Sequence, residues 1–98
     1  MLFAVLFEDD DTKSGMRMMH MEDHLAFLQR NAGAIISAGP LSDPQTQSGA
    51  GGLWIVRAAD AAHARALVEE DPFWPTGLRK SVRIMAWHQV FADGSRLA

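Results

Sequence analysis

Four short segments of the chain carry the hydrophobic pattern of β-strands. Residues 2–7, 34–41 and 53–56 are mostly continuous apolar runs that are too short for helices, and residues 81–91 alternate with apolar side chains on both faces. The Gly-Pro pair at 39–40 is expected to stop the second run, and the stretch rich in Gly, Ser and Pro that follows it is expected to be a loop. The sequence therefore predicts four strands.

Two segments between these runs have the spacing of amphipathic helices. Apolar residues recur every three or four positions over residues 16–32, which predicts one long helix. The stripe consists of Met18, Met21, Leu25, Leu28 and Ala32. Ser14 is a suitable N-cap for this helix and Gly33 a suitable end. Asp60 can cap a second helix, which should end near Glu70 because the residue before a proline avoids helical backbone angles.

The predicted order is β-α-β-β-α-β, which favours an α+β ferredoxin-like sandwich with one antiparallel four-stranded sheet and two helices on one face. The helices would leave the other face of the sheet uncovered, where Met85 and Trp87 would be exposed. Soluble monomers avoid large apolar patches, so we expect a homodimer that packs sheet against sheet. Residues 1–98 are expected to form a single domain, with residues 92–98 as a flexible tail.

Composition and charge indicate a globular protein. Hydrophobic residues make up 48% and charged residues 21% of the 98 positions, and the net charge is −3 without a basic cluster. We therefore expect no nucleic-acid partner. The first apolar run is too short to span a membrane and follows no basic segment, so we expect a cytoplasmic protein without a membrane partner.

The stretch HMEDH at residues 20–24 places two histidines four positions apart, on one face of a helix. A zinc site needs three or four protein ligands, and the chain has no cysteine. The other two histidines, His63 and His88, lack a partner at helical spacing, and no glutamate directly follows His20 as it would in a metalloprotease helix. We therefore predict that the chain binds no metal.

His24 and Asp71 are the residues best placed for proton chemistry. His24 lies at the edge of the predicted apolar stripe and can face a cleft, although a single histidine is more often packed against a backbone carbonyl. Asp71 is fixed by the proline that follows it, and Phe73 should anchor the same turn in the core. A carboxylate there could orient an imidazole. The sequence alone does not establish that the two side chains meet.

Several short motifs resemble those of the YciI-like (YCII-related) family of small dimeric α+β barrel proteins. They are HLAFL at 24–28, SAGPL at 37–41, and DPF at 71–73 followed by Gly77. The resemblance extends over nearly the whole chain, from LFAVLFED to VRIMAWHQVF. It implies the dimeric α+β barrel fold that the strand and helix pattern also favours.

The resemblance also implies which residues form the site. The family carries a His–Asp pair, and the matching positions here are His24 and Asp71. We also expect Gly39, Pro40, Phe73 and Arg17 to bind substrate. The family often has an arginine three residues before the histidine, where this chain has Met21. Arg17, one helical turn earlier, could take over a role in anion binding.

The family includes a branch that removes chloride from hydroxylated aromatics, and its fold is similar to that of muconolactone isomerases. The leading hypothesis is therefore a cofactor-free lyase or isomerase that acts on a small compound, with His24 as general acid or base and Asp71 as its orienting partner. One alternative is a non-catalytic dimer that binds a small ligand or assists another protein. Another is a cofactor-independent monooxygenase.

Overall fold

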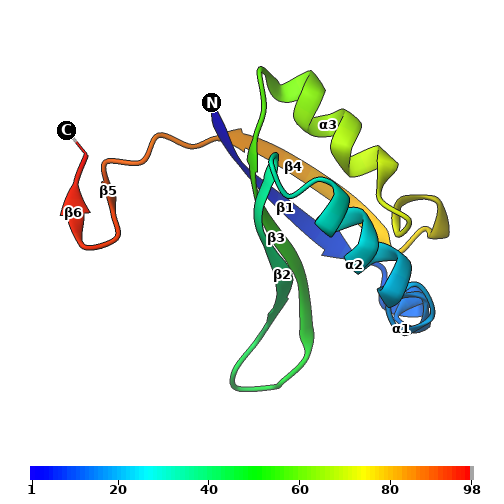
Figure 1. The fold of residues 1–98 in the computed structure, drawn as a ribbon. Helices are drawn as coiled ribbons and strands as arrows, with labels where there is room; N and C mark the ends of the chain where they lie inside the picture. Colours follow the sequence, from blue (N-terminus) through cyan, green and yellow to red (C-terminus); the bar gives the residue numbers. More distant parts are fainter. Residues whose placement is uncertain (98) are drawn as a thin grey trace.

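The computed structural model describes residues 1–97 and contains a four-stranded antiparallel sheet with helices on one face (Figure 1). The strands are β1 (Leu2–Asp9), β2 (Ile35–Ser42), β3 (Gly49–Arg57) and β4 (Arg79–Ala86), in the order β2-β3-β1-β4. The helices are α1 (Gly15–Met19), α2 (Met21–Arg30) and α3 (Ala61–Glu70), with short 3₁₀ turns at Asp11–Lys13 and Trp74–Thr76. The predicted ferredoxin-like sandwich is confirmed.

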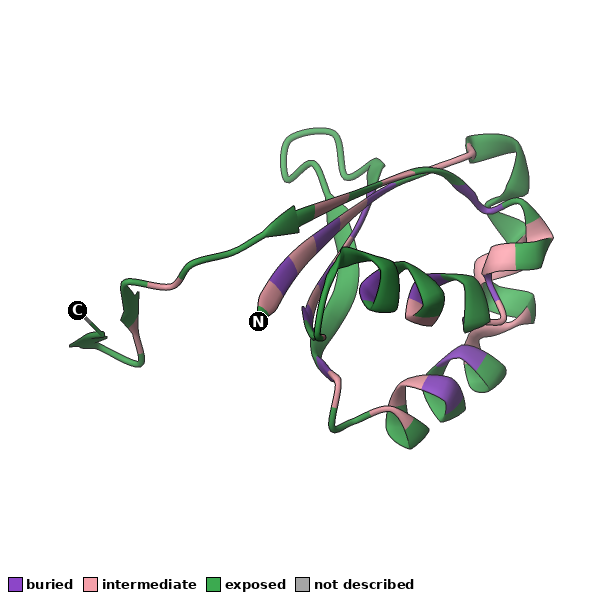
Figure 2. Ribbon diagram, turned by 90° about the horizontal axis from the view of Figure 1, so that it is seen from above, coloured by how far each residue is buried: buried purple, intermediate pink, exposed green. Residues whose placement is uncertain are grey.

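The core lies between the sheet and the two longer helices. Buried residues alternate along β1 and lie on the inner sides of α2 and α3 (Figure 2). This alternation is expected for a sheet with one covered face. The buried apolar residues that pack together are Phe3, Val5, Phe7, Phe27, Ile35, Trp54, Val56, Ala64 and Val68.

No helix of residues 1–97 covers the opposite face of the sheet (Figure 2). Most of its side chains are apolar, although Arg83 of β4 lies opposite Leu6 of β1. Ala4 of β1 lies opposite Met85 of β4, and Leu6 lies opposite Leu53 of β3. Met85 is exposed, as is Trp87, whose backbone N–H donates to the carbonyl of Leu2. The predicted uncovered apolar face is therefore present.

The long helix predicted over residues 16–32 is wrong in two respects. The chain leaves helical geometry at His20, where φ is −109° and ψ is 11°, so α1 and α2 are separate helices. Met18 and Leu25 of the predicted stripe are 87% and 49% exposed, whereas His24 and Phe27 are buried. Because of the break, the spacing of three and four residues does not continue from α1 into α2. The apolar stripe that begins in α1 therefore does not predict which residues of α2 are buried. Ser14 also makes no side-chain capping bond.

The strand boundaries differ from prediction at several places. β3 begins at Gly49, inside the stretch that was predicted to be a loop, and β4 begins at Arg79. β2 does not stop at Gly39-Pro40 but continues to Ser42, because it is an edge strand and a proline there removes no sheet hydrogen bond that is needed. β4 ends at Ala86, and the chain continues into a small hairpin of β5 (Phe91–Ala92) and β6 (Ser95–Arg96). The flexibility of residues 92–98 stays a prediction, and Ala98 lies outside the described residues.

The second predicted helix is confirmed. The Asp60 side chain accepts a hydrogen bond from the backbone N–H of His63 at 2.9 Å and caps α3 as expected. The helix ends at Glu70, before the Asp71-Pro72 pair. Within residues 1–97, none of the helices has the length and apolar character needed to cross a membrane.

Candidate functional site

His24 of α2 meets Asp71 at the C-terminal end of α3. Its imidazole Nδ1 lies 2.8 Å from Asp71 Oδ1, although the two residues are 47 positions apart in sequence, and both are buried. An ionised carboxylate oxygen only accepts hydrogen bonds, so Nδ1 is the donor. The other ring nitrogen, Nε2, then remains to accept or release a proton.

The turn that ends α3 fixes the carboxylate. Asp71 has extended backbone angles (φ −63°, ψ 131°), as expected for a residue that precedes a proline. Its Oδ1 also accepts a hydrogen bond from the backbone N–H of Phe73 at 3.1 Å. The carboxylate is therefore held by its own turn as well as by His24, and the local sequence DPF determines this geometry.

Aromatic rings fix the plane of the imidazole. The ring of Phe73 stacks on His24 with 4.1 Å between centroids and 16° between planes, and Trp54 lies 6.3 Å away at a tilt of 33°. Phe73 is completely buried and is not among the residues that line the pocket beside His24. Phe73 therefore contacts the imidazole directly, and its role in binding substrate stays a prediction.

A pocket of about 80 Å³ opens beside His24, with walls from α1, α2, β2, β3 and β4. Arg17, Gly39 and Pro40, three of the residues predicted to bind substrate, line this pocket together with His24. Met21 lines it as well, at the position where the family often carries arginine. Because β2 continues through Gly39-Pro40, these two residues line the same pocket as the side chains of α2.

Arg79 also lines the pocket, and the sequence did not point to it. Its Nη1 donates to Asp9 Oδ1 at 3.0 Å, and its guanidinium lies over the ring of Phe7 at 4.1 Å from the centroid. Arg17 donates to the other oxygen of Asp9. Burial lowers the pKa of Arg79, and the Asp9 carboxylate opposes that effect. Two cations therefore share one carboxylate at the wall of the pocket.

The position of Arg79 depends on an irregularity in the sheet. β1 and β4 shift register between Glu8 and Asp9, so that Glu8 lies opposite Ser81 whereas Asp9 lies opposite Arg79. Lys80 is the extra residue, and the bulge turns Arg79 toward the helices. Simple alternation would have placed Arg79 on the same face as Ser81. The only sign in the sequence was the pair of cations, Arg79 and Lys80, just before the predicted strand.

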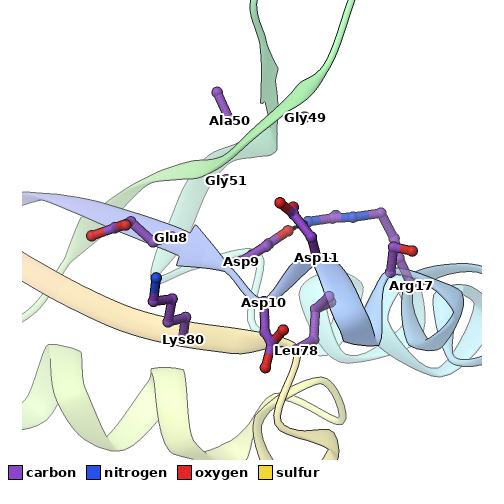
Figure 3. Close-up of a pocket in the computed structure, with 11 residues that line it drawn as sticks. Glu8, Asp9, Asp10, Asp11, Arg17, Gly49, Ala50, Gly51, Leu78 and Lys80 are labelled. Carbon is purple, nitrogen blue, oxygen red and sulfur yellow. Dashed lines mark hydrogen bonds and ion pairs between the residues drawn. The ribbon is translucent and has the colours of Figure 1, made fainter.

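A second pocket, of about 420 Å³, lies at the end of β1 and is lined by acidic residues (Figure 3). Glu8, Asp9, Asp10 and Asp11 surround it, and Arg17 reaches toward Asp9 from its helix (Figure 3). His24 does not line this pocket. No group of three or more potential ligands suited to a metal ion is found among residues 1–97. The predicted absence of a bound metal stays a prediction.

Comparison with known proteins agrees with this architecture. A solved structure of 5-chloro-2-hydroxyhydroquinone dehydrochlorinase from Burkholderia phenoliruptrix, in complex with 2,5-dihydroxybenzoquinone, superimposes with a TM-score of 0.79. The two chains share 26% sequence identity, and the match covers 90% of this chain and 94% of the dehydrochlorinase chain. This similarity supports the dimeric α+β barrel as the fold class. No curated protein sequence matches the chain.

The family assignment comes from a separate sequence comparison. The profile of the YCII-related domain matches residues 1–88, which include the whole sheet, the three helices and both members of the His24–Asp71 pair. The match covers far more than half of the chain and agrees with the motifs found in the sequence. The chain belongs to the YCII-related family.

Proposed function

We propose that this protein is an enzyme that transfers protons on a small organic compound bound beside His24. The observation that carries the proposal is the buried hydrogen bond between His24 and Asp71 at the wall of a pocket. The carboxylate holds the imidazole in one tautomer, so that Nε2 can act as general base and then as general acid. A proton transfer of this kind uses only protein side chains and needs no cofactor.

The reaction class that we propose is an elimination or isomerisation. In an elimination, the imidazole takes a proton from the substrate while a leaving group departs with its bonding electrons, and no oxidant or reductant is consumed. Support for a hydroxylated aromatic substrate comes from the similar dehydrochlorinase structure, which holds 2,5-dihydroxybenzoquinone. The aromatic and apolar side chains of Trp54, Leu25 and Leu28 in the pocket wall suit a planar ring.

The test is a panel of halogenated and unhalogenated hydroxyhydroquinones, with chloride release and quinone absorbance as the readouts. We expect His24→Gln to reduce turnover by about 10²- to 10⁴-fold, the usual contribution of a general acid–base group. Asp71→Asn should cause a smaller loss, because an amide oxygen can still accept the Nδ1 hydrogen bond without the negative charge. His63→Gln, at an exposed histidine on α3, is the matched control and should leave turnover unchanged.

The panel also separates the two alternatives. A protein that binds members of the panel but never turns them over would be a ligand-binding or accessory protein. Oxygen uptake with unhalogenated quinols, measured with an oxygen electrode, would instead indicate a monooxygenase. If the His24→Gln variant turned over substrate as fast as the wild type, the proposed role of the His24–Asp71 pair would be contradicted. This holds for a proton-transfer reaction and for a monooxygenase.

We also propose that two copies pair through the uncovered face of the sheet. The support is the exposed apolar surface around Met85 and Trp87, which a second sheet could bury.

A further inference from the structure

Arg79 is a buried cation whose hydrogen bonds are not all made. Its side chain is 3% exposed, and Nη1 is bonded to Asp9. Its Nε has no hydrogen-bond partner within the part of the chain that the structure describes. Buried N–H groups of charged side chains are nearly always paired, because leaving one unpaired is costly. A guanidinium in the wall of a pocket with an unused donor is therefore a candidate ligand contact.

The charged groups near the pocket are two arginines and two carboxylates. Asp9 is paired with both Arg17 and Arg79. Asp71 accepts hydrogen bonds from His24 and from a backbone N–H, and its negative charge also acts on Arg79. Arg17 and Arg79 line the pocket, whereas Asp9 and Asp71 do not. An anion in the pocket would therefore meet the two cations and not the two carboxylates.

Gly52 provides the space that the guanidinium occupies. A Cβ atom at Gly52 would lie 3.2 Å from Nη1 of Arg79 and 3.4 Å from the carbonyl oxygen of Gly39. Gly52 is buried in the middle of β3, a place where glycine weakens a strand unless something approaches closely. The absence of a side chain at Gly52 is explained by the close approach of Arg79.

We infer that Arg79 binds an anionic oxygen of the ligand and determines that the pocket accepts anions. The ligand class is a small planar compound that carries an ionised hydroxyl group, as hydroxyquinones do, or a carboxylate. This inference rests on the proposed function, because it assigns the ligand of the pocket beside His24. It adds a recognition residue, Arg79, and a residue that positions it, Gly52.

Paired ligands test the inference by isothermal titration calorimetry on the full-length protein. The anions are 2,5-dihydroxybenzoquinone, whose hydroxyls are vinylogous acids, and benzoate. Their neutral counterparts are 2,5-dimethoxybenzoquinone and benzamide. We expect the wild type to bind at least one anion more tightly than its neutral counterpart. Comparing the two pairs shows whether the anionic oxygen is that of a hydroxyquinone or that of a carboxylate.

The decisive variant is Arg79→Met, which keeps an unbranched apolar stem but removes the guanidinium and its charge. We expect it to weaken anion binding by about tenfold or more and to leave neutral ligands unaffected, since a hydrogen bond to a charged group contributes that much. Arg79→Lys should retain part of the affinity and its dependence on salt. Arg30→Met, at an exposed arginine near the end of α2, is the control and should bind like the wild type.

Gly52→Ala tests the same site without removing a charge. Its methyl group must displace the Arg79 guanidinium by a few tenths of an ångström, because Nη1 is the nearest atom. We expect a folded protein with weaker anion binding, so this variant decides the question if Arg79→Met does not fold. Circular dichroism and melting temperature establish folding in each case.

Three results would overturn the inference. They are wild-type protein that binds no anion, equal affinity for the charged and neutral partners, and unchanged anion affinity in the folded Arg79 and Gly52 variants. The proposed function fails in a different way. Anion binding that depends on Arg79, without turnover of any compound and without an effect of His24→Gln, would retain the binding site and remove the catalytic role.

Discussion

Gly51 and Gly52 are neighbours in β3, but different constraints apply to them. Gly51 has φ +90°, a backbone conformation that residues with a side chain rarely adopt, and a Cβ there would lie 1.8 Å from the carbonyl oxygen of Phe7. Gly52 needs no such conformation and only leaves room for Arg79. A substitution at the first position should therefore affect folding, and one at the second should affect the pocket.

We predict that Gly51→Ala destabilises the protein by about 1–3 kcal/mol or more, because it combines an unfavourable φ with a backbone clash. Gly49→Ala is the matched control in the same strand, since nothing lies within 4 Å of the position of its Cβ. Urea denaturation of both variants measures the free energy of unfolding. Equal stability of the two variants would show that β3 does not approach Phe7 in this way.

The residues of the candidate site differ in how far the sequence reveals them. Asp71 is placed by a local rule, because a proline after a helix fixes the turn and the direction of the preceding side chain. His24 was found as a residue at the edge of a stripe, yet it is buried. Arg79 could not be found from alternation, because the bulge at Lys80 in its own strand, β4, reverses the face on which it lies.

The helices and strands themselves were easier to predict than which of their side chains face the core. Short apolar runs show where the four strands lie, and a proline after α3 shows where that helix ends, because these signals are local. The ends of the strands, such as the start of β3 at Gly49, were not predicted. The division of the first helix at His20 has no such signal, because the apolar spacing continues through the position where the backbone leaves helical geometry. The exposed side chains of Met18 and Leu25 are the result.

The N-cap of α3, Asp60, should make the stability of the protein depend on pH. Hydrogen bonds from the backbone N–H of His63, and then from its side chain, lower the pKa of Asp60 below its ordinary value of 3.8. A carboxylate with a lowered pKa stabilises the folded state above its unfolded pKa, and this contribution is lost as the pH falls through the folded pKa. The cap is therefore fully effective at neutral pH.

We predict that Asp60→Ala lowers the melting temperature at neutral pH, and that its difference from the wild type decreases as the pH falls below 3.8. Asp60→Asn is the control, because an amide accepts the capping hydrogen bond without titrating. The difference in melting temperature between Asp60→Asn and Asp60→Ala should not depend on pH through this residue, because neither side chain titrates. If the difference in melting temperature between the wild type and Asp60→Ala did not change with pH, the assigned role of the carboxylate would be contradicted.

At the scale of the whole molecule, the sheet has one covered and one uncovered face. The uncovered face carries Met85 and Trp87 at 47% and 41% exposure, beside half-buried apolar residues of β1 and β3. An apolar surface of this kind on a small soluble protein usually contacts another chain. A second copy is the simplest partner, because a two-fold axis lets the same surface cover itself.

We predict that the wild type is a dimer at micromolar concentration and that Met85→Glu or Trp87→Glu makes it a monomer. A buried charge without a partner costs about 3–5 kcal/mol, which is enough to dissociate a moderate interface. Met19→Glu places the same charge on exposed α1 and should leave the dimer intact. Size-exclusion chromatography with light scattering measures the mass, and a folded monomeric wild type would disprove the pairing.

The bulge at Lys80 also matters for how related chains are aligned with this one. Consider a relative in which the strands equivalent to β1 and β4 pair without the extra residue. There, the residue opposite the Asp9 position comes directly before the residue opposite the Glu8 position. Here Arg79 and Ser81 occupy those two positions and are separated by Lys80. An ungapped alignment would then match Arg79 to a residue outside the pocket. A one-residue gap at Lys80 restores the spatial equivalence, so the identity of the pocket cation in relatives should be read only after that gap is placed.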